Sequence, residues 1–333
     1  MQRRATVRDV AAAAGVSQAT ASRALSGNSS VSPDLARRVL AASRELGYTA
    51  NVMARALRTQ QTGTIGVVVP AITNPYFISA VEALERVLAD SQRSLVLCDA
   101  QNSPTVEAER IELLVNRMVD GLVVVPVSRD SAPALRAAAA RGPVVQFDRF
   151  VDDTGTDFVG ADNVDGVRQA MNHLRSKGAR SIAYVGAKPT SSAASERLRA
   201  YQELAGPDEL SGELLGEFST EWGQEAARRL IACDALPEAI MCGSDTIAVG
   251  LLAVLRDAGI GVPGEVLVAS YDDSLMGRIT SPRLTSVRQP VDVMAREAVR
   301  LLDDAPSDER PPRKSIFTPS LVIRESSGGD SAR

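Results

Sequence analysis

The sequence TVRDVAAAAGVSQATASRALSG, residues 6–27, predicts two short helices that meet at a tight turn. Thr6 stands where a helix N-cap belongs, and Asp9 follows three residues later as the acidic partner of a capping box. Gly15 ends the first helical pattern, because it can adopt the positive φ angle that such a turn requires. Ser17 is placed to cap the second helix. Two short helices that cross closely at a glycine turn are typical of a helix-turn-helix.

The second helix is expected to turn short polar and cationic side chains outward. Ala21 and Leu25 form its inner face. The side chains left outside are Gln18, Ala19, Ser22 and Arg23. Amide, hydroxyl, methyl and guanidinium groups are the ones that read base edges in the major groove of DNA. A plain helical hairpin in an enzyme is the alternative interpretation, since turn glycines are common.

A third helix and a linker follow, and they favour the DNA-binding interpretation. Ser32-Pro33 is an N-cap followed by proline at the first helical position. An apolar stripe at helical spacing comes next, formed by Leu35, Val39 and Leu46. Gly47 is placed to end this helix. Residues 51–58 are a helix-capable linker of about two turns, so the segment predicts a three-helix headpiece with a hinge.

This N-terminal segment resembles the headpiece and hinge of the LacI/GalR family of bacterial transcription regulators. The matching motifs are VRDVA (7–11), AGVS (14–17), TASR (20–23), VS (31–32), LGY (46–48), Asn51 and ARAL (54–57). The resemblance implies binding to a pseudo-palindromic operator in double-stranded DNA. The DNA-binding positions that it implies are Thr6, Ser17, Gln18, Ala19, Ser22, Arg23, Ser32, Asn51, Ala54 and Leu57. We expect the hinge to become helical on DNA and Leu57 to enter the minor groove as a wedge.

Charge divides the chain into a basic head and an acidic body. Residues 1–61 carry nine arginines, no lysine and three acids, which gives a net charge of +6. The whole chain of 333 residues has a net charge of −4, which leaves −10 for the remainder. This length allows two or three domains. The asymmetry indicates a nucleic-acid-binding module attached to a part with another task.

Cysteine and histidine usage gives no sign of a metal site. Cys98, Cys233 and Cys242 are widely spaced without a CxxC motif, and His173 is the only histidine in the sequence. The sequence begins without an apolar signal segment, and no later run is long enough to span a membrane. We therefore expect a cytoplasmic protein with no metal, no cofactor and no catalytic residue.

Beyond the polar linker at residues 59–63, strand patterns alternate with helical patterns. Apolar runs that fit buried parallel strands lie at 65–69, 95–98, 121–125, 144–147, 181–185, 239–242 and 266–269. Helical patterns lie at 77–88, 106–118, before Ala140, and at 167–177, 196–204, 223–233 and 246–258. This alternation predicts α/β architecture with parallel sheets, and the break near 152–162 predicts two such sheets. There is no GxGxxG after a strand, no Walker phosphate loop and no GxSxG elbow.

The family resemblance continues through this region. The matching motifs are TGTIGVVVP (62–70), NPYF (74–77), VDGLVVVP (119–126), QFDR (146–149), RLRAY (197–201), CGSD (242–245), YDD (271–273) and SPRLTSVRQP (281–290). The resemblance implies a two-lobed, periplasmic-binding-protein-like core, whose chain crosses between lobes near Asp162, Gln289 and Ser320. The expected fold class is thus an N-terminal all-α helix-turn-helix headpiece plus an α/β two-lobed core with parallel sheets.

Domain boundaries follow from these assignments. The headpiece is expected at 1–50, the hinge helix and linker at 51–61, and the effector-binding and dimerisation core at 62–325. Lobe 1 would take about 62–162 and 290–320, and lobe 2 about 163–289 and 321–325. The remaining residues, 326–333, are rich in glycine and serine and are expected to be disordered. They lack the apolar heptads of a tetramer-forming coiled coil, so we expect a homodimer.

A small-molecule effector, expected to be a sugar, needs acids and an arginine for hydrogen bonds and an aromatic face for stacking. Open α/β sheets place such ligands at strand ends. The candidates, each at a ligand-contacting position of the family, are Tyr76, Phe77, Asp148, Arg197, Phe218, Ser244, Asp245 and Asp272. A strand-end aspartate is also common as a helix cap, and the aromatic residues at 76 and 77 also fit a core.

Among the departures from the family pattern, two concern the effector-binding core. Ser244 replaces the usual asparagine, and this shorter hydroxyl predicts a contact that is lost or mediated by water. Trp222 stands where a small polar residue is usual, as a second stacking platform or as a cover for the lobe.

Three functional hypotheses remain. The favoured one is a dimeric repressor whose affinity for its operator is controlled by the effector between the lobes. A solute-binding protein of a transport system fits the same core, but the basic headpiece counts against it. An enzyme on an α/β core has little support, because the sequence has one histidine and none of the nucleophile motifs named above.

Overall fold

The chain forms two compact units, Met1–Thr62 and Gly63–Arg333, in a computed structural model. The structure describes residues 5–25, 31–47, 61–205, 214–232, 236–304 and 311–329. The predicted hinge contacts of Asn51, Ala54 and Leu57 lie outside these residues. The two units are described separately below.

The first unit contains three helices, α1 (Val7–Ala14), α2 (Gln18–Leu25) and α3 (Pro33–Glu45). Thr6 and Asp9 form the predicted capping box, and Gly15 takes φ 63° at the C-cap of α1. The Arg38 guanidinium of α3 donates a 2.6 Å hydrogen bond to the Ala14 carbonyl, which ties the turn to the third helix. The small core of this unit consists of Val10, Ala11, Ala14, Ala21, Ala24, Val39 and Ala42.

The predicted third helix is confirmed at its start and wrong in one detail. Ser32 is the N-cap of α3 and is followed by a proline in the first turn, as predicted, although its side chain makes no capping hydrogen bond. Leu46 lies beyond the end of the helix and is 41% exposed, so it is not part of the apolar stripe. Ala42 is buried instead, because it lies three residues after Val39 on the same helical face.

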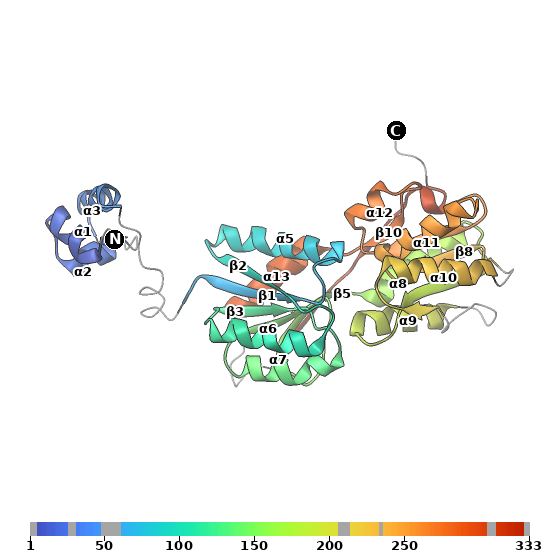
Figure 1. Ribbon diagram of the computed structural model, residues 1–333, viewed down its shortest axis with the longest axis horizontal. Helices are drawn as coiled ribbons and strands as arrows, with labels where there is room; N and C mark the ends of the chain where they lie inside the picture. The colour runs from blue at the N-terminus through green and yellow to red at the C-terminus, as the bar shows by residue number, and fades with distance from the viewer. Residues whose placement is uncertain are drawn as a thin grey trace. The chain divides into compact units, whose positions relative to one another are not determined.

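The second unit has two lobes, each built on a six-stranded sheet (Figure 1). The sheet of lobe 1 has the order β11-β5-β4-β3-β1-β2, and its strands are parallel. The strands are β1 (Thr64–Val69), β2 (Ser94–Asp99), β3 (Gly121–Val124), β4 (Val144–Phe147), β5 (Asp157–Ala161) and β11 (Lys314–Phe317). The helices are α5 (Pro75–Asp90), α6 (Pro104–Asn116), α7 (Ala132–Ala139), α13 (Val291–Asp303) and the 3-10 turn η1 (Arg129–Ser131).

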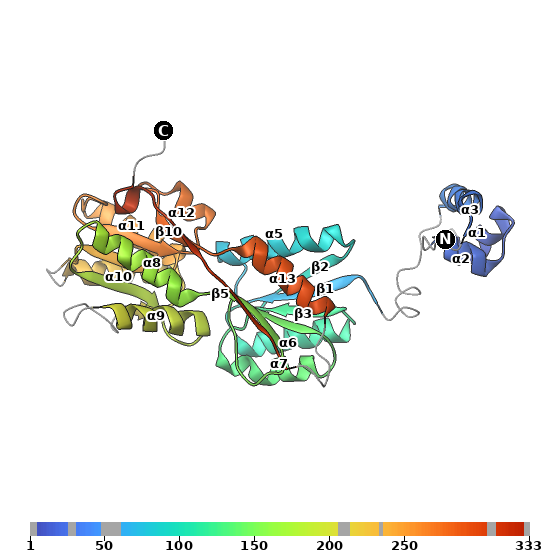
Figure 2. The same cartoon turned by 180° about the vertical axis from the view of Figure 1, so that it is seen from behind.

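Helices cover both faces of this sheet (Figure 2). On one face α5 and α13 pack on β1 through apolar residues such as Leu84 and Leu301. On the other face α6 and α7 bury Leu114 and Leu135 against Leu122 of β3. Strands covered on both sides must be apolar throughout, which explains their continuous apolar sequences.

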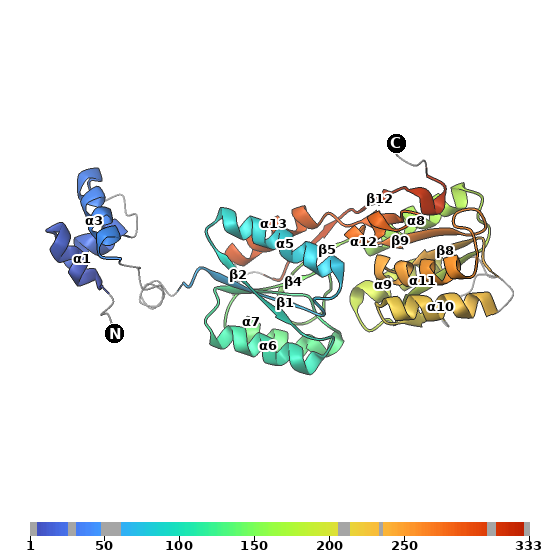
Figure 3. The ribbon, with the colours of Figure 1, turned by 45° about the horizontal axis from the view of Figure 1, so that its top comes forward.

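Lobe 2 repeats this three-layer plan (Figure 3). Its sheet has the order β12-β10-β9-β8-β6-β7. The strands are β6 (Ile182–Ala187), β7 (Leu215–Gly216), β8 (Ala239–Cys242), β9 (Leu267–Tyr271), β10 (Thr285–Arg288) and β12 (Ser320–Val322). The helices are α8 (Asn163–Ser176), α9 (Ser192–Leu204), α10 (Thr220–Ala232), α11 (Asp245–Asp257), α12 (Leu275–Ile279) and the 3-10 turn η2 (Glu325–Ser327). One face carries α8 and α9, and the other carries α10 and α11.

The chain passes between the two lobes at three places. It leaves lobe 1 after β5 and begins α8, returns from β10 to α13, and leaves again from β11 to β12. The sequence predicted parallel sheets. In lobe 2 the final strand, β12, is an exception, because it pairs antiparallel with β10. The reversal follows from its position, because β12 enters lobe 2 from the side at which β10 leaves it.

The C-terminal segment is more ordered than predicted. The predicted disorder of residues 326–333 is wrong for residues 326–329, while residues 330–333 lie outside the described part. Ser326 Oγ donates to the Val268 carbonyl at 2.6 Å and accepts from Thr285 N at 2.8 Å. Ser327 Oγ lies 2.7 Å from His173 Nε2. Glycine and serine content predicted disorder, but these hydroxyls satisfy buried polar groups of lobe 2.

Candidate DNA-reading face and inter-lobe ligand site

The predicted DNA-reading side chains of α2 lie outside the apolar core of the headpiece. Gln18, Ala19 and Arg23 are exposed and Ser22 is half-buried, whereas Ala21 beneath them is fully buried. Ser17 Oγ accepts a 3.1 Å hydrogen bond from Thr20 N, as an N-cap should. The exposed hydroxyls of Thr6, Ser17 and Ser32 lie at the N-terminal ends of α1, α2 and α3. Helix N-termini with exposed hydroxyls are suited to contact phosphate oxygens.

In the second unit, two aspartates occupy equivalent places in the two lobes. Asp148 follows β4 with φ 63°, and Asp272 follows β9 with φ 104°. Each backbone N–H donates a 2.8 Å hydrogen bond to the next strand, at Val159 and at Val287. Left-handed backbone is uncommon for residues with a Cβ and occurs often at functional sites, at a cost of about 1–3 kcal/mol. This geometry aims both carboxylates out of their strand ends.

Arg197 anchors the lobe 2 side of the site. It lies on α9 and is 3% exposed. Its Nε donates to Asn163 Oδ1 at 2.8 Å, and its NH1 donates to the Gly243 carbonyl at 2.9 Å. NH1 also lies 3.6 Å from Asp272 Oδ1, and the guanidinium carbon lies 3.6 Å from the Tyr271 ring centroid. These contacts hold the cation of Arg197 beside the carboxylate of Asp272.

A hydrogen-bond chain joins the lobes. Tyr76 at the start of α5 donates from its hydroxyl to Gln289 Oε1 at 3.1 Å. Gln289 Nε2 in turn donates to Asp272 Oδ1 at 3.0 Å. Gln289 lies in the link between β10 and α13, so the chain runs from lobe 1 through a crossing segment to lobe 2.

Arg149 lies between two aromatic rings from different lobes. Its guanidinium carbon is 5.3 Å from the ring centroid of Phe77 in lobe 1 and 5.3 Å from that of Phe218 in lobe 2. Its Nε lies 3.8 Å from Asp148 Oδ2, which is beyond hydrogen-bond distance. The predicted stacking residues Phe77 and Phe218 are therefore brought together, with an arginine between them.

Burial changes the ionisation of these groups. It raises the pKa of Asp272 to about 7, although the neighbouring Arg197 cation opposes this shift. Burial, together with the charges of Asp148 and Asp272, raises the pKa of the Tyr76 phenol. Burial lowers the pKa of Arg149. Each shift has the direction expected when a charge leaves water.

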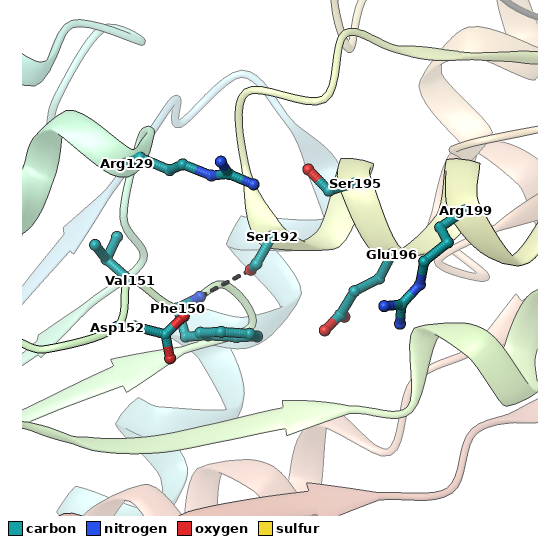
Figure 4. A pocket seen from close by; sticks show the side chains of 8 residues that line it. All are labelled: Arg129, Phe150, Val151, Asp152, Ser192, Ser195, Glu196 and Arg199. Carbon is teal, nitrogen blue, oxygen red and sulfur yellow. Dashed lines mark hydrogen bonds between the residues drawn. The ribbon is translucent and has the colours of Figure 1, made fainter.

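A cavity of about 620 Å³ lies beside these residues and takes its walls from both lobes (Figure 4). Its lining residues are Arg129, Phe150, Val151, Asp152, Ser192, Ser195, Glu196 and Arg199. Phe150 N donates a 2.9 Å hydrogen bond to Ser192 Oγ across the lobes. Asn163 connects the cavity to the deeper site, because its amide nitrogen donates to Glu196 Oε2 at 2.8 Å while its oxygen accepts from Arg197.

Two further predicted residues, at positions 244 and 245, are buried within lobe 2. Ser244 is fully buried and caps α11, where its Oγ accepts from Ile247 N at 3.3 Å. Asp245 is 1% exposed and accepts hydrogen bonds from Ser270, Ser274 and Ser286. Both side chains are engaged within lobe 2, and their predicted contact with the ligand stays a prediction. Trp222 covers lobe 2, where its indole N–H donates to the Gly186 carbonyl at 2.9 Å.

Sequence reasoning missed Arg149, Gln289 and Asn163. The first two stand inside the motifs QFDR and SVRQP, beside residues that were singled out. Their presence in those motifs was the available signal. Asn163 follows the first lobe crossing and carried no motif signal.

A helix-turn-helix unit joined to a two-lobed α/β unit, with acids, arginines and aromatic rings gathered between the lobes, defines a class of ligand-responsive DNA-binding regulators. A sequence model described as "Bacterial regulatory proteins, lacI family" matches residues 6–51. A second, described as "Periplasmic binding protein-like domain", matches residues 171–327.

The chain is 31% identical to the HTH-type transcriptional repressor PurR of Mannheimia succiniciproducens, over 97% of this chain and 98% of that protein. It is 32% identical to the HTH-type transcriptional regulator GalR of Salmonella typhimurium, over 97% of this chain and 96% of that protein. The chain therefore belongs to the LacI family and is a DNA-binding transcriptional repressor.

Solved structures agree with this fold. The lac repressor dimer bound to operator and the anti-inducer ONPF has a TM-score of 0.85 at 24% identity, covering 98% of this chain and 99% of that chain. The transcriptional regulator CelR in complex with cellobiose has a TM-score of 0.70 at 32% identity, covering 97% and 100%. These matches support a headpiece of helices and a two-lobed α/β core with parallel sheets.

No helix in the described ranges is long and apolar enough to cross a membrane. Within the same ranges, no three His, Cys, Asp or Glu side chains are grouped as metal ligands.

Proposed function

We propose that the protein is a homodimeric repressor whose operator affinity is set by a sugar-like effector bound between the two lobes. The observation that carries this proposal is that Asp148 of lobe 1 lies close enough to Asp272 and Arg197 of lobe 2 for their charges to interact. Two acids and an arginine can share the vicinal hydroxyls of a polyol, and the rings of Phe77 and Phe218 offer stacking faces. The relative CelR, which was solved with cellobiose, adds support for a carbohydrate.

The dimer is supported by apolar side chains left exposed on lobe 1 and lobe 2. The exposed residues on α5, β2 and α12 are Ile78, Val96, Leu97, Leu275 and Ile279. Isolated exposed apolar residues are common, but several on neighbouring elements favour an interface. Sedimentation of the full chain should give a dimer, and an operator with two half-sites should bind it more tightly than one half-site.

The test of effector control is operator titration by fluorescence anisotropy, with and without a sugar found in a thermal-shift screen. Asp148→Asn should keep wild-type operator affinity but lose the response to the sugar, because the substitution removes an acceptor in the site. Asp130→Asn, on the exposed η1 turn of the same lobe, is the matched control and should respond normally. Loss of operator binding in Asp148→Asn, or a normal response, would contradict the assignment of the site.

The hinge remains a separate proposal. Asn51, Ala54 and Leu57 are proposed to contact the minor groove and to bend the operator when the two hinges of a dimer pair. Leu57→Ala should weaken operator binding and reduce bending without changing sugar affinity. If Leu57→Ala bends the operator as much as the wild-type protein does, the proposal that Leu57 acts as a wedge is wrong.

The alternative function, a solute-binding protein of a transport system, has less support. The match of residues 6–51 to a bacterial regulatory family and the exposed reading face of α2 favour DNA binding. We also infer that the effector is bound and not converted. Candidate sugars incubated with the protein should be recovered chemically unchanged. Conversion of a sugar into a product would support the enzyme hypothesis instead.

A further inference from the structure

Arg149 is a buried cation whose hydrogen-bonding capacity is unused. It is 7% exposed, and its Nε has no hydrogen-bond partner. Among the described residues, its guanidinium donates no hydrogen bond, and its single ion-pair contact is Asp148 Oδ2 at 3.8 Å. A guanidinium has five N–H donors arranged as a fork, so this one lacks the acceptors that its geometry fits.

The other buried arginine of the site provides a contrast. Arg197 has acceptors at Asn163 and Gly243 and a carboxylate at Asp272. A buried cation needs such partners, since desolvation without them is costly. The protein itself thus supplies the hydrogen-bond acceptors of Arg197, whereas it supplies none for the Nε of Arg149.

Nearby acids do not supply a close carboxylate partner for Arg149. Glu107 of α6 is fully buried, and its Oε2 also has no partner, yet it forms no ion pair with Arg149 among the described residues. Burial raises the pKa of Glu107, which favours its neutral form. Burial likewise raises the pKa of Asp272 to about 7. Because their neutral forms are favoured, the carboxyl groups of Glu107 and Asp272 neutralise less of the positive charge of the arginines than two ionised carboxylates would.

The adjoining cavity is lined by two arginines, Arg129 and Arg199, and by two acids, Asp152 and Glu196. Asp152 pairs with Lys314 at 2.9 Å, and Arg199 lies 3.7 Å from Glu203. Arg129 is exposed, makes no ion pair among the described residues and extends toward Ser192 and Ser195 at the start of α9 (Figure 4). Helix N-termini favour negative charge.

We propose that the effector carries an anionic group, a carboxylate or a phosphate, which Arg149 binds between the rings of Phe77 and Phe218. This inference rests on the proposed effector site and narrows its ligand to acidic or phosphorylated polyols. The neutral hydroxyls of the ligand would go to Asp148 and Asp272. Carboxylate and phosphate oxygens match the guanidinium fork in two-point contacts that a single hydroxyl cannot make.

The first experiment probes the anion site with inorganic phosphate, and with acetate as a carboxylate, against chloride at equal ionic strength. The full chain is compared with Arg149→Gln, Arg149→Lys and the exposed control Arg117→Gln by thermal shift and calorimetry. Phosphate or acetate should stabilise wild type and Arg117→Gln, with affinity at least tenfold lower for Arg149→Gln. Arg149→Lys should lie between, because it keeps the charge but loses the fork. Equal stabilisation of wild type and Arg149→Gln, or none in either, would overturn the proposal.

The second experiment compares matched ligands, such as glucose, glucuronate and glucose 6-phosphate, and the corresponding galactose set. Wild type should prefer the acidic or phosphorylated member, and Arg149→Gln should lose that preference. If Arg149→Gln instead binds a neutral sugar more tightly than wild type, Arg149 merely fills the stacking position of the sugar, and the proposal is wrong. If phosphate binds through Arg149 but no ligand alters operator affinity, the anion site stands and the proposed control of DNA binding fails.

Discussion

At the scale of single residues, Asp272 is held where its ionised form is disfavoured. Burial raises its pKa to about 7, while an aspartate in an unfolded chain has a pKa of about 3.9. Between about pH 4 and pH 7 the folded chain therefore holds a proton that the unfolded chain has released. The contribution of Asp272 to the free energy of unfolding falls as the pH rises through this range, and it is constant above about 7.

Asp272→Asn should remove this dependence. Urea unfolding at several pH values should show wild type losing stability relative to the variant as the pH rises, by at most about 1.4 kcal/mol per pH unit. Above about pH 7 the difference between them should stop changing. Parallel curves across the whole range would show that Asp272 ionises normally in the folded protein.

Arg23 carries the second prediction at this scale. Its side chain is exposed on α2, and its Nε donates to the Ala19 carbonyl at 3.3 Å. Arg23→Ala should weaken operator binding by about 1–3 kcal/mol and relax base preference at one position in each half-site. Arg44→Ala, at the exposed end of α3, is the control for charge. Equal weakening on operator and random DNA would mean that Arg23 contacts only phosphates.

Residue types at strand ends were predictable, but their partners were not. Asp148, Arg197 and Asp272 were selected because they follow or open predicted elements and match family positions. The contact of Gln289 with Tyr76 joins residues 213 positions apart, and nothing in local sequence specifies it. Ser244 and Asp245 were assigned to the ligand because they match family positions, and the sequence did not reveal that they also form a helix cap and bind buried serines.

At the scale of elements, the contact between α10 and α11 depends on glycine. A Cβ at Gly223 would lie 2.0 Å from the Ile247 carbonyl oxygen, and one at Gly250 would lie 2.0 Å from that of Thr220. Backbone cannot move aside as a flexible side chain can, so Gly223→Ala should destabilise lobe 2 by about 1–3 kcal/mol. Gly264→Ala, with open space around it, should change stability far less. Urea unfolding of both variants tests this, and equal midpoints would contradict the close contact.

The helices and strands that periodicity predicted are present, with errors at their ends, whereas helix α13 (Val291–Asp303) and strand β10 (Thr285–Arg288) were not predicted. Helix α9 begins at Ser192 and α8 at Asn163, four residues before the expected starts, because Ser191 and Asp162 cap them. Strand β5 was interpreted as a break between sheets, since Asp157 and two glycines nearby obscure its apolar pattern. The C-terminal turn η2 was missed because its stability comes from long-range hydrogen bonds.

At the scale of the whole core, the lobes are linked by three crossing segments and by contacts at the site. A ligand can shift the arrangement of the lobes only by as much as it binds one arrangement better than another. A coupling of about 1–3 kcal/mol corresponds to a change in operator affinity of about 5- to 150-fold. Linkage requires that the operator change the ligand affinity by the same factor, whichever the sign.

Ser192 tests whether contact between the lobes contributes to this coupling. Its Oγ accepts a 2.9 Å hydrogen bond from Phe150 N across the lobes, whereas Ser195 Oγ donates to the Pro189 carbonyl within lobe 2. Both serines line the same cavity, so they are a matched pair. A typical hydrogen bond contributes about 0.5–1.5 kcal/mol, so Ser192→Ala should lower ligand affinity by about 2- to 13-fold, and Ser195→Ala should not. Calorimetry measures these affinities, and anisotropy measures the operator response. If the two variants behave alike, the hydrogen bond between Phe150 and Ser192 does not stabilise the arrangement that the ligand selects, and the coupling must pass through Gln289 and the crossing segments instead.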